Sequence, residues 1–399
     1  MNEFEEKLLG TIPADLNVVS NDDVVFSADG RNVAYVAERE RKRVVMVNDT
    51  RGPEFDWSDR PVFSPDGKNV AYVGVTDIDW KVWLDWNTPN FERGGKWYVI
   101  TDAKRLGPYD YAWLISFNPD GKRVAFAALK DKKWHVVNGD SIGESFDWVG
   151  VPHFGSDGRV AYTASSGNKS FMVVDKKRGS VFDEVGDPAW SPDGKKLVYA
   201  ARRGNKWYAV VETTMSPAYD QVRSVWFSKR GSLSFIANRK GRAFAVVDGK
   251  DEERFDDIPG VVFSEDASAW GYAAKTGEQW IAVSGSKRGK PAKSVTGIAV
   301  SNGGDRLAYA NYDSVYRVII DEKILQETSD MPTGLRFTAN GKNLAYILVG
   351  DENKAVGING TSTQYFDDVR TFVISPDGKK IGVGARDGNQ LWWKVLEVK

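Results

Sequence analysis

Few residues of this 399-residue chain belong to the types that carry out acid–base, metal or thiol chemistry. Cysteine is absent, which excludes disulfides and cysteine-based metal or redox sites. Only two histidines occur. His135 follows Trp134 in an apolar run and is interpreted as a structural residue, whereas His153 directly precedes Phe154 and could face a ligand. Because a lone imidazole makes neither a metal site nor a proton relay, we predict no catalytic residue, no metal and no cofactor.

Aspartate recurs at two fixed places along the chain, which raises the question of calcium binding. One set directly follows an aromatic residue, as Asp56 follows Phe55, and the other precedes glycine, as Asp66 precedes Gly67. Aspartate side chains readily accept hydrogen bonds from nearby backbone N–H groups in turns. We therefore interpret both sets as structural residues of turns. Neither a Gly-x-Ser-x-Gly nucleophile motif nor a phosphate-binding glycine loop is present.

Both sets of aspartates belong to one pattern that recurs ten times. The clearest copy is Phe63-Ser64-Pro65-Asp66-Gly67, followed by Ala71-Tyr72. Successive copies lie 36 or 37 residues apart, with one step of 54. A repeat of this length predicts a propeller or a solenoid. The first residues of the ten copies, called anchors below, are Phe26, Phe63, Phe117, Phe154, Trp190, Phe227, Phe263, Val300, Phe337 and Ile374.

Each repeat reads as four short antiparallel strands. Segments such as 196–201 and 207–211 are rich in β-branched and aromatic residues and are bounded by Gly, Asn and Asp. The Ser-Pro-Asp-Gly element predicts a tight turn, because proline presets φ and glycine accepts a left-handed conformation. A four-stranded sheet that is apolar on both faces must be covered on both faces, and radial stacking of blades achieves this.

We therefore predict an all-β fold, a β-propeller of ten four-stranded blades in one ring over residues 1–399. The chain ends on the third strand of the tenth repeat, at 391–396, so the fourth strand is expected from the N-terminus, at 16–19. The N- and C-terminal strands would then share a blade and close the ring. Two five-bladed propellers are the alternative, although the 37-residue step from 190 to 227 leaves no residues for a second closure.

Repeats of this Phe/Trp-Ser-Pro-Asp-Gly…Ala-Tyr type resemble the WD-repeat-like blades of the TolB propeller family. The resemblance covers nearly the whole chain and implies the propeller fold. It implies no single function, because such blades serve as scaffolds, peptide binders and parts of enzymes. TolB-like propellers that act as lyases depend on metal-ligating histidines, and two histidines are too few for that chemistry.

The 54-residue step contains a 17-residue insertion, residues 76–92, between the second and third strands of blade two. The insertion carries Trp80, Trp83 and Trp86, and three further tryptophans, Trp57, Trp113 and Trp148, lie where the chain enters blades two, three and four. All six fall outside the repeated positions and on one face of a propeller. They are expected to form a small packed cap, a partner-binding surface with Asp59 and Arg60, or both, since tryptophan is enriched at interface hot spots.

The function predicted first is a non-catalytic scaffold that binds a protein or peptide through this aromatic face. The alternative is an enzyme or a binder of a sugar or acidic ligand in the central channel, near His153, Asp187, Arg223, Arg336 and Arg370. A net charge of −1 gives no general attraction to nucleic acid or anionic membranes. The first residues lack the pattern of a signal peptide, so a cytoplasmic location is expected. The oligomeric state is left open.

Overall fold

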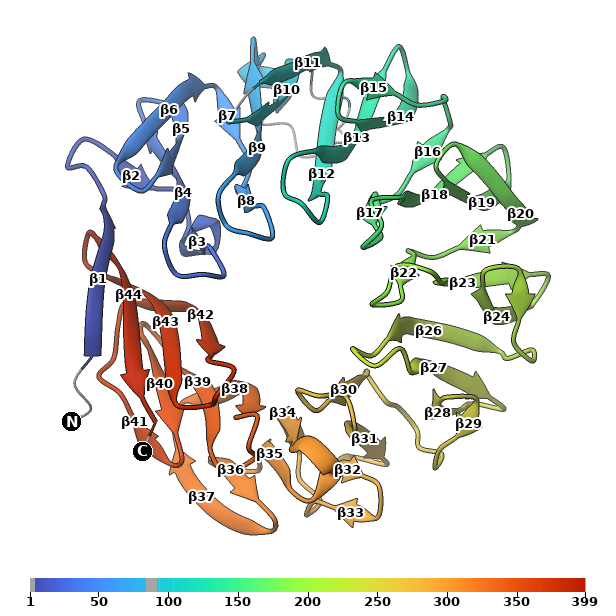
Figure 1. Cartoon of the computed structure of the whole chain (residues 1–399), viewed down its shortest axis with the longest axis vertical. Coiled ribbons are helices and arrows are strands. Elements are labelled where there is room, and N and C mark those ends of the chain that lie inside the picture. Colours follow the sequence, from blue (N-terminus) through green and yellow to red (C-terminus); the bar gives the residue numbers. More distant parts are fainter. Residues whose placement is uncertain (1–3, 84–91, 93, 103, 399) are drawn as a thin grey trace. The chain divides into compact units, whose positions relative to one another are not determined.

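The computed structural model describes residues 4–83, 92, 94–102 and 104–398, and these residues form an all-β, ten-bladed propeller (Figure 1). Six of the ten sheets have four strands and four have five, because the innermost strand of those four is broken into two pieces. Neighbouring strands pair in antiparallel fashion, as the sequence predicts. Among the described residues, none of the helices has the length and apolar character needed to cross a membrane.

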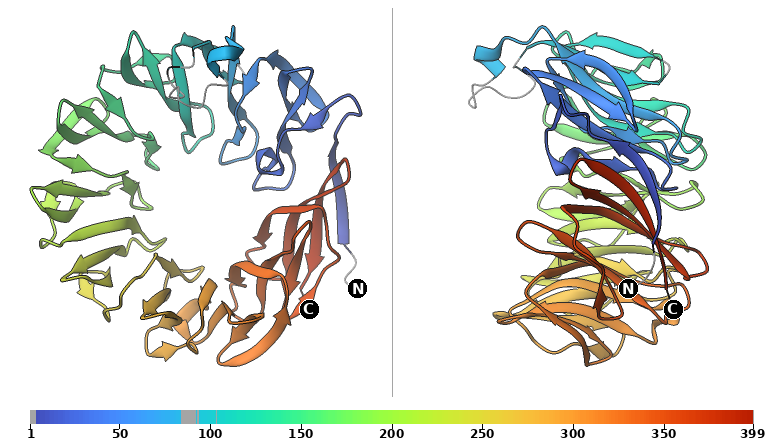
Figure 2. Two further views of the ribbon diagram at one scale, coloured as in Figure 1. Left: turned by 180° about the vertical axis from the view of Figure 1, so that it is seen from behind. Right: turned by 90° about the vertical axis from the view of Figure 1, so that its left-hand side faces the viewer.

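The strands of each blade follow one another along the chain, from the innermost outwards (Figures 1 and 2). Blade one contains β2 (Asn17–Val18), β3 (Val25–Phe26), β4 (Val33–Arg39), β5 (Lys42–Val47) and β6 (Thr50–Phe55). Blade two contains β7 (Trp57–Ser58), β8 (Val62–Phe63), β9 (Val70–Thr76), β10 (Lys96–Thr101) and β11 (Arg105–Tyr109). Blade three contains β12 (Tyr111–Phe117), β13 (Val124–Lys130), β14 (Lys133–Asn138) and β15 (Ser141–Ile142). Blade four contains β16 (Trp148–Val149), β17 (His153–Phe154), β18 (Val160–Ser166), β19 (Lys169–Val174) and β20 (Lys177–Phe182).

The same order continues through blades five to nine. Blade five contains β21 (Glu184–Val185), β22 (Ala189–Trp190), β23 (Leu197–Arg203), β24 (Lys206–Val211) and β25 (Thr214–Met215). Blade six contains β26 (Gln221–Phe227), β27 (Leu233–Arg239), β28 (Arg242–Val247) and β29 (Lys250–Asp251). Blade seven contains β30 (Val261–Phe263), β31 (Trp270–Thr276), β32 (Gln279–Ser284) and β33 (Lys287–Arg288). Blade eight contains β34 (Ser294–Val300), β35 (Leu307–Tyr312), β36 (Tyr316–Ile320) and β37 (Lys323–Thr328). Blade nine contains β38 (Met331–Phe337), β39 (Leu344–Val349), β40 (Lys354–Ile358) and β41 (Thr361–Ser362).

Blade ten combines three strands from the C-terminal end of the chain with one from the N-terminal end. It contains β42 (Asp368–Ile374), β43 (Lys380–Asp387), β44 (Gln390–Glu397) and β1 (Phe4–Thr11). The prediction that the two terminal strands share a blade is therefore confirmed, but the segment proposed for it is wrong. Part of 16–19 forms β2, which pairs with β4 inside blade one. The earlier segment β1 lies beside β44.

The chain divides into two compact units, and each unit contains several of the ten sheets. The N-terminal unit consists of Leu8–Gly204 and Asn389–Trp392, and the C-terminal unit consists of Met1–Lys7, Asn205–Gly388 and Trp393–Lys399. Blades one to four lie in the first unit and blades six to nine in the second. The division cuts through sheets rather than between them, so the alternative of two separate five-bladed propellers does not describe the chain.

The Ser-Pro-Asp-Gly turns join neighbouring blades as well as neighbouring strands. In blade two, Ser64 Oγ donates to Asp66 Oδ1 at 2.6 Å, which fixes the turn. Gly67 adopts φ +71°, and a Cβ atom there would lie 2.9 Å from the Cβ of Ser27 in the turn of blade one. The Asn32 amide of blade one also donates to the Gly67 carbonyl, at 3.0 Å. Glycine therefore serves both the turn and the close approach of two blades.

The aspartate that follows the aromatic residue links blades in a second way. Asp147 accepts a hydrogen bond from Lys133 Nζ at 2.7 Å and another from the backbone N–H of Gly167, at 2.7 Å, in a hairpin of the next blade. Lys133 holds the pKa of Asp147 below its ordinary value. Asp183 and Asp220 make the same pair of contacts. The interpretation of these aspartates as structural residues bound to backbone is confirmed.

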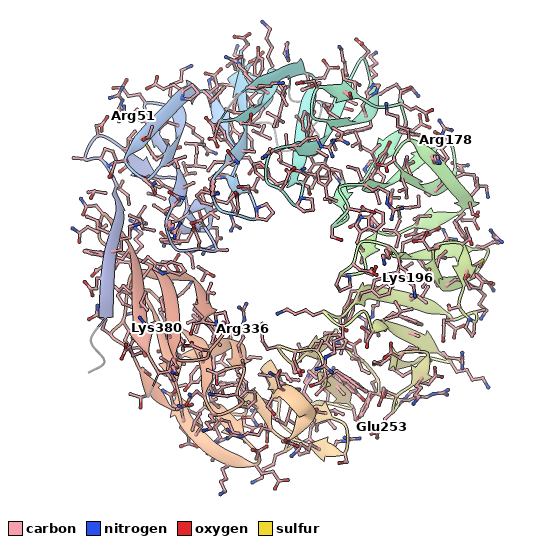
Figure 3. All side chains as sticks on the ribbon, viewed as in Figure 1. Arg51, Arg178, Lys196, Glu253, Arg336 and Lys380 are labelled. Atoms are coloured by element: carbon pink, nitrogen blue, oxygen red, sulfur yellow. The ribbon has the colours of Figure 1, made fainter. Side chains whose placement is uncertain are left out.

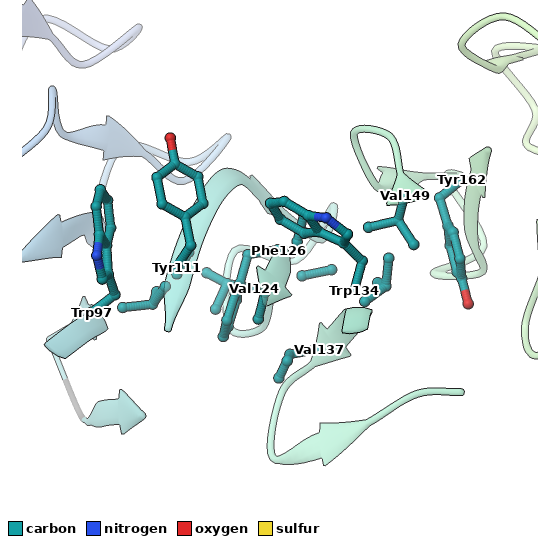
Figure 4. Packing of buried hydrophobic residues seen from close by; sticks show 14 of the residues in the cluster. Trp97, Tyr111, Val124, Phe126, Trp134, Val137, Val149 and Tyr162 are labelled. Carbon is teal, nitrogen blue, oxygen red and sulfur yellow. The ribbon is translucent and has the colours of Figure 1, made fainter. Parts of the chain in front are cut away.

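The repeated aromatic residues form the core between the sheets. The tyrosine of the Ala-Tyr strand is fully buried in four blades, at Tyr35, Tyr272, Tyr309 and Tyr346. Figure 4 shows how Trp97, Tyr111, Phe126 and Trp134 alternate with valines of blades three and four. Burial of a large apolar side chain contributes roughly 1.5–3 kcal/mol. An aromatic residue fills the position of this tyrosine in nine of the ten blades and Val383 fills it in blade ten, so the contribution recurs around the fold.

Candidate functional site

The insertion of blade two lies between β9 and β10. Its described part contains one helical turn, α1 (Trp80–Trp83), which projects beyond the strands of its own blade (Figure 2). The Asp79 carboxylate accepts from the Lys81 N–H at 3.0 Å and so caps the start of the turn. Trp86, a predicted site residue, lies outside the described residues.

The turn is fixed to the blade by three tryptophan rings. The Trp83 side chain is buried, and its ring centroid lies 5.9 Å from that of Trp57 and 5.7 Å from that of Trp97. The rings of Trp57 and Trp97 are themselves 5.7 Å apart. These separations are typical of packed aromatic pairs. The described turn of the insertion therefore packs onto the blade, in the manner of the cap expected from the sequence.

The row of rings continues from blade two into blade three. Trp97 contacts Tyr111 at 4.2 Å between centroids, and Tyr111 contacts Trp113 at 6.0 Å and Trp134 at 5.9 Å. The Trp113 Nε1–H group is buried without a hydrogen-bond partner among the described residues. Leu114, which follows it, adopts φ +60° at an irregularity in the pairing of β12. Bulky residues avoid this conformation, so the backbone beside Trp113 is strained.

Charged residues border the exposed edge of this aromatic stack. The guanidinium carbon of Arg43 lies 5.7 Å from the centre of the Trp57 ring, and Arg43 Nη1 donates to the Ser58 carbonyl at 3.3 Å. Asp59 and Arg60 are exposed, and the Asp59 carboxylate accepts from the Arg60 N–H at 2.8 Å. Of these predicted residues, Trp57 contacts α1 through the Trp83 ring, whereas Asp59 and Arg60 follow Trp57 in the chain and make no hydrogen bond or ion pair with α1 within the described residues.

Trp148 lies apart from the stack. It is 42% exposed and has no ring contact with the stacked residues in the part of the chain that the structure describes. A Cβ atom at Gly150 would lie 3.1 Å from the Trp148 ring and 3.2 Å from the Asp187 carboxylate. The glycine therefore leaves room between an exposed indole and an acidic group. Trp148 is therefore not part of the stack, and the prediction that the six tryptophans share one face stays a prediction.

His153 is partly enclosed on β17. Its Nε2 atom is buried and makes no hydrogen bond to any described residue. Burial lowers the pKa of His153, and the nearby Asp187 carboxylate opposes that shift. The His153 carbonyl accepts from Trp190 Nε1 at 3.0 Å, which fixes the backbone of β17 to blade five. The imidazole is therefore kept neutral over most of the physiological range.

Two of the arginines predicted for a channel site are already engaged. Arg223 Nη2 donates to the Asp257 carboxylate and, at 3.0 Å, to the Ile258 carbonyl, so it links blade six to blade seven. The Asp368 carboxylate lies 3.4 Å from Arg370 Nη1 and 2.6 Å from Lys354 Nζ. Both arginines therefore neutralise carboxylates of their own unit.

Arg336 differs from these two arginines. It lies on β38 and its side chain is exposed (Figure 3). It borders a cleft of about 510 Å³ in the C-terminal unit, along the ends of the innermost strands β26, β30, β34 and β38. The sequence names Arg336 as a candidate for a channel site, but it does not indicate this cleft or its other lining residues. Whether an arginine is paired depends on its neighbours in space, which its own repeat does not encode.

Comparison with known proteins adds little to these observations. No family model matches the chain, and no curated protein matches it. One of the solved structures that it resembles is described as the Dos1 propeller, with 12% sequence identity and a TM-score of 0.40. That match covers 72% of this chain and 92% of the other. Since the similarity is this low, the propeller assignment rests on the ten sheets themselves.

Proposed function

We propose that this protein is a non-catalytic propeller scaffold of the WD-repeat-like TolB type, which binds a protein or peptide partner beside the inserted helical turn. The seating of Trp83 between Trp57 and Trp97 is the observation that carries this proposal. It holds α1 from below, whereas Lys81 and Val82 of the same turn face solvent. A projecting element that exposes an apolar side chain is suited to partner recognition.

The surroundings of the turn also suit a protein interface. Trp57 is half-buried beside Arg43. The exposed residues Asp59 and Arg60 follow it in the chain, and the proposal includes them in the same surface. Tryptophan and arginine dominate interface hot spots, and polar residues usually surround them. The proposal keeps a cytoplasmic location and no nucleic-acid or membrane partner, both of which cell fractionation and binding assays would test.

The experiment uses a double variant, Lys81→Glu with Val82→Glu, which alters the exposed side of α1 and leaves Trp83 in place. Tagged full-length protein is used for affinity capture from lysate of the native host, with quantitative mass spectrometry. Val181→Glu is the matched control, because Val181 is 53% exposed on β20, outside this surface. We expect one partner to be depleted with the double variant alone. Equal capture by all three proteins would contradict the proposed surface.

The alternative function, a ligand site in the central channel, has less support at Arg223 and Arg370, because carboxylates already pair with both. Arg336 is the arginine of that set that keeps its capacity to bind a ligand.

A further inference from the structure

The cleft of blades six to nine has the size of a small-molecule site. Its volume of about 510 Å³ falls within the range of roughly 300–1,000 Å³ that is typical of ligand pockets. The innermost strands of four successive blades supply its walls, so its shape is set by rigid sheets. All of its lining residues lie in the C-terminal unit.

The floor of this cleft is apolar and partly open to solvent. Val262 on β30 is 37% exposed, and Ile298 on β34 and Phe263 are half-buried. Leu335 and Phe337, on β38, are buried beneath. Removing exposed apolar surface from water is favourable, by about 25 cal/mol per Å². The floor therefore favours a ligand with an apolar body.

The uncharged polar side chains of the cleft are already used by the turns. Ser264 Oγ donates to Asp266 at 2.9 Å, and Thr338 Oγ1 donates to Asn340 at 2.7 Å. Asn302 accepts from the Asp266 N–H at 3.0 Å and donates to the Ala339 carbonyl at 2.7 Å. A sugar, which needs many hydrogen-bond partners, would find few here.

Among the charged side chains that line the cleft, Arg336 forms no ion pair within the described residues. Lys229 Nζ and Glu265 form an ion pair at 2.5 Å. The Arg336 guanidinium lies 5.1 Å from the Phe372 ring and makes neither a hydrogen bond nor an ion pair within the described residues. A guanidinium presents paired N–H donors that match the two oxygens of a carboxylate. Stacking on Phe372 holds it ready for such a contact.

We infer that this cleft binds a small amphipathic carboxylate, with the carboxylate on Arg336 and the apolar body on Val262 and Ile298. The inference is independent of the partner surface beside α1, because that surface belongs to the N-terminal unit. An experiment that rules out one of the two sites would therefore not count against the other.

Calorimetric titration of the full chain with sodium octanoate tests this inference. We expect saturable binding at one site, and at least tenfold weaker binding of octanamide, which has the same length without the charge. Arg336→Met keeps the length of the side chain and removes its charge. It should weaken octanoate binding at least tenfold and leave octanamide binding unchanged.

Two control variants separate the cleft from general effects of charge. Arg254 has the same arrangement as Arg336 outside the cleft, with its guanidinium 5.1 Å from the Phe244 ring, so Arg254→Met should leave octanoate binding unchanged. Val262→Glu should abolish octanoate binding, whereas Val181→Glu should not. Absence of saturable octanoate binding, equal binding of octanamide, or equal losses in Arg336→Met and Arg254→Met would each overturn the inference. Circular dichroism checks that every variant is folded.

Discussion

The aromatic stack of blades two and three and the cleft of blades six to nine treat apolar side chains in opposite ways. In the stack, Trp83 of the insertion covers Trp57 and Trp97, and the rings fill the space. In the cleft, Val262 stays exposed and Arg336 has no polar partner among the described residues. The comparison teaches that several tryptophans close together can simply pack against one another. An unpaired charged side chain beside exposed apolar residues is a better sign of an open site.

One position of the repeat shows this contrast directly. His153 and Arg336 both directly precede an anchor residue, Phe154 and Phe337 respectively, on an innermost strand. The imidazole is enclosed and its pKa is lowered by burial. The guanidinium is exposed and charged. The same backbone position therefore supports either a neutral packed group or a free cation.

The largest effect is expected from removal of a stacked ring. Trp97→Ala should lower the apparent free energy of unfolding by about 3–5 kcal/mol, because the side chain is buried and a cavity is left behind. Urea denaturation followed by fluorescence measures the change. Trp148→Ala is the control, and its cost should stay below about 1 kcal/mol because that ring is 42% exposed. Similar losses in both variants would mean that the stack does not contribute special stability.

A smaller difference is expected between two turn glycines. Gly121, in the inner turn of blade three, and Gly341, in the corresponding turn of blade nine beside the cleft, adopt φ of +73° and +68°. Alanine at either should cost about 1–2 kcal/mol from the left-handed backbone alone. A Cβ at Gly121 would lie 2.9 Å from that of Ser64, but a Cβ at Gly341 would lie 3.3 Å from that of Ser301.

Gly121→Ala should therefore cost a further 1–2 kcal/mol or so from overpacking. Thermal unfolding of the two variants, measured side by side, gives the difference. Equal shifts of the unfolding temperature would show that the blades are spaced alike in the two regions. Ala267 occupies the same turn position in blade seven with φ +56°, so alanine is tolerated where space allows.

The pH dependence of stability should report on His153. Its pKa is lowered from 6.5 by burial, so the unfolded chain binds this proton more readily than the folded chain. Stability contributed by the neutral imidazole is complete above about pH 6.5 and is lost as pH falls below that value. The drop in urea midpoint between pH 7.5 and 5.5 should be smaller in His153→Gln than in the unaltered protein. An identical drop would place the imidazole in a solvent-like environment.

The smallest effect on stability is expected at Arg336. Arg336→Met should change the free energy of unfolding by less than about 0.5 kcal/mol, because the side chain is exposed and has no ion pair to lose. The same denaturation experiment measures it. A loss above 1 kcal/mol would mean that Arg336 supports the fold, and the contrast with the stack would disappear.

Much of this fold could be predicted because its determinants are local and repeated. The turn at Ser64–Gly67 depends on the chemistry of four adjacent residues, and the hydrogen bond from Ser64 to Asp66 follows from it. The position of the insertion follows from counting along the repeat. The segment β1 escaped prediction because Phe4–Thr11 carries none of the repeated residues, and its pairing depends on a strand at the opposite end of the sequence.

The candidate sites were less predictable, for a related reason. The sequence identifies six tryptophans outside the repeat, but not that Trp83 covers Trp57 while Trp148 stays exposed. That distinction depends on how a non-repeated insertion folds. The importance of Arg336 depends on the absence of a carboxylate near it, whereas Arg223 and Arg370 have one. Whether an arginine is paired depends on residues of other repeats, so the sequence of its own repeat does not predict it.

The pairing of β1 with β44 also has a consequence for synthesis. Lys394 is nearly buried, with 5% of its side chain exposed, and Glu6 on β1 meets its ammonium group at 2.6 Å. These partners are 388 positions apart, so Glu6 leaves the ribosome long before Lys394 is made. Until then the first strand emerges as an unpaired edge, with Leu8 and Leu9 available to other chains. We therefore expect this strand to be open to misassembly until β44 has been made.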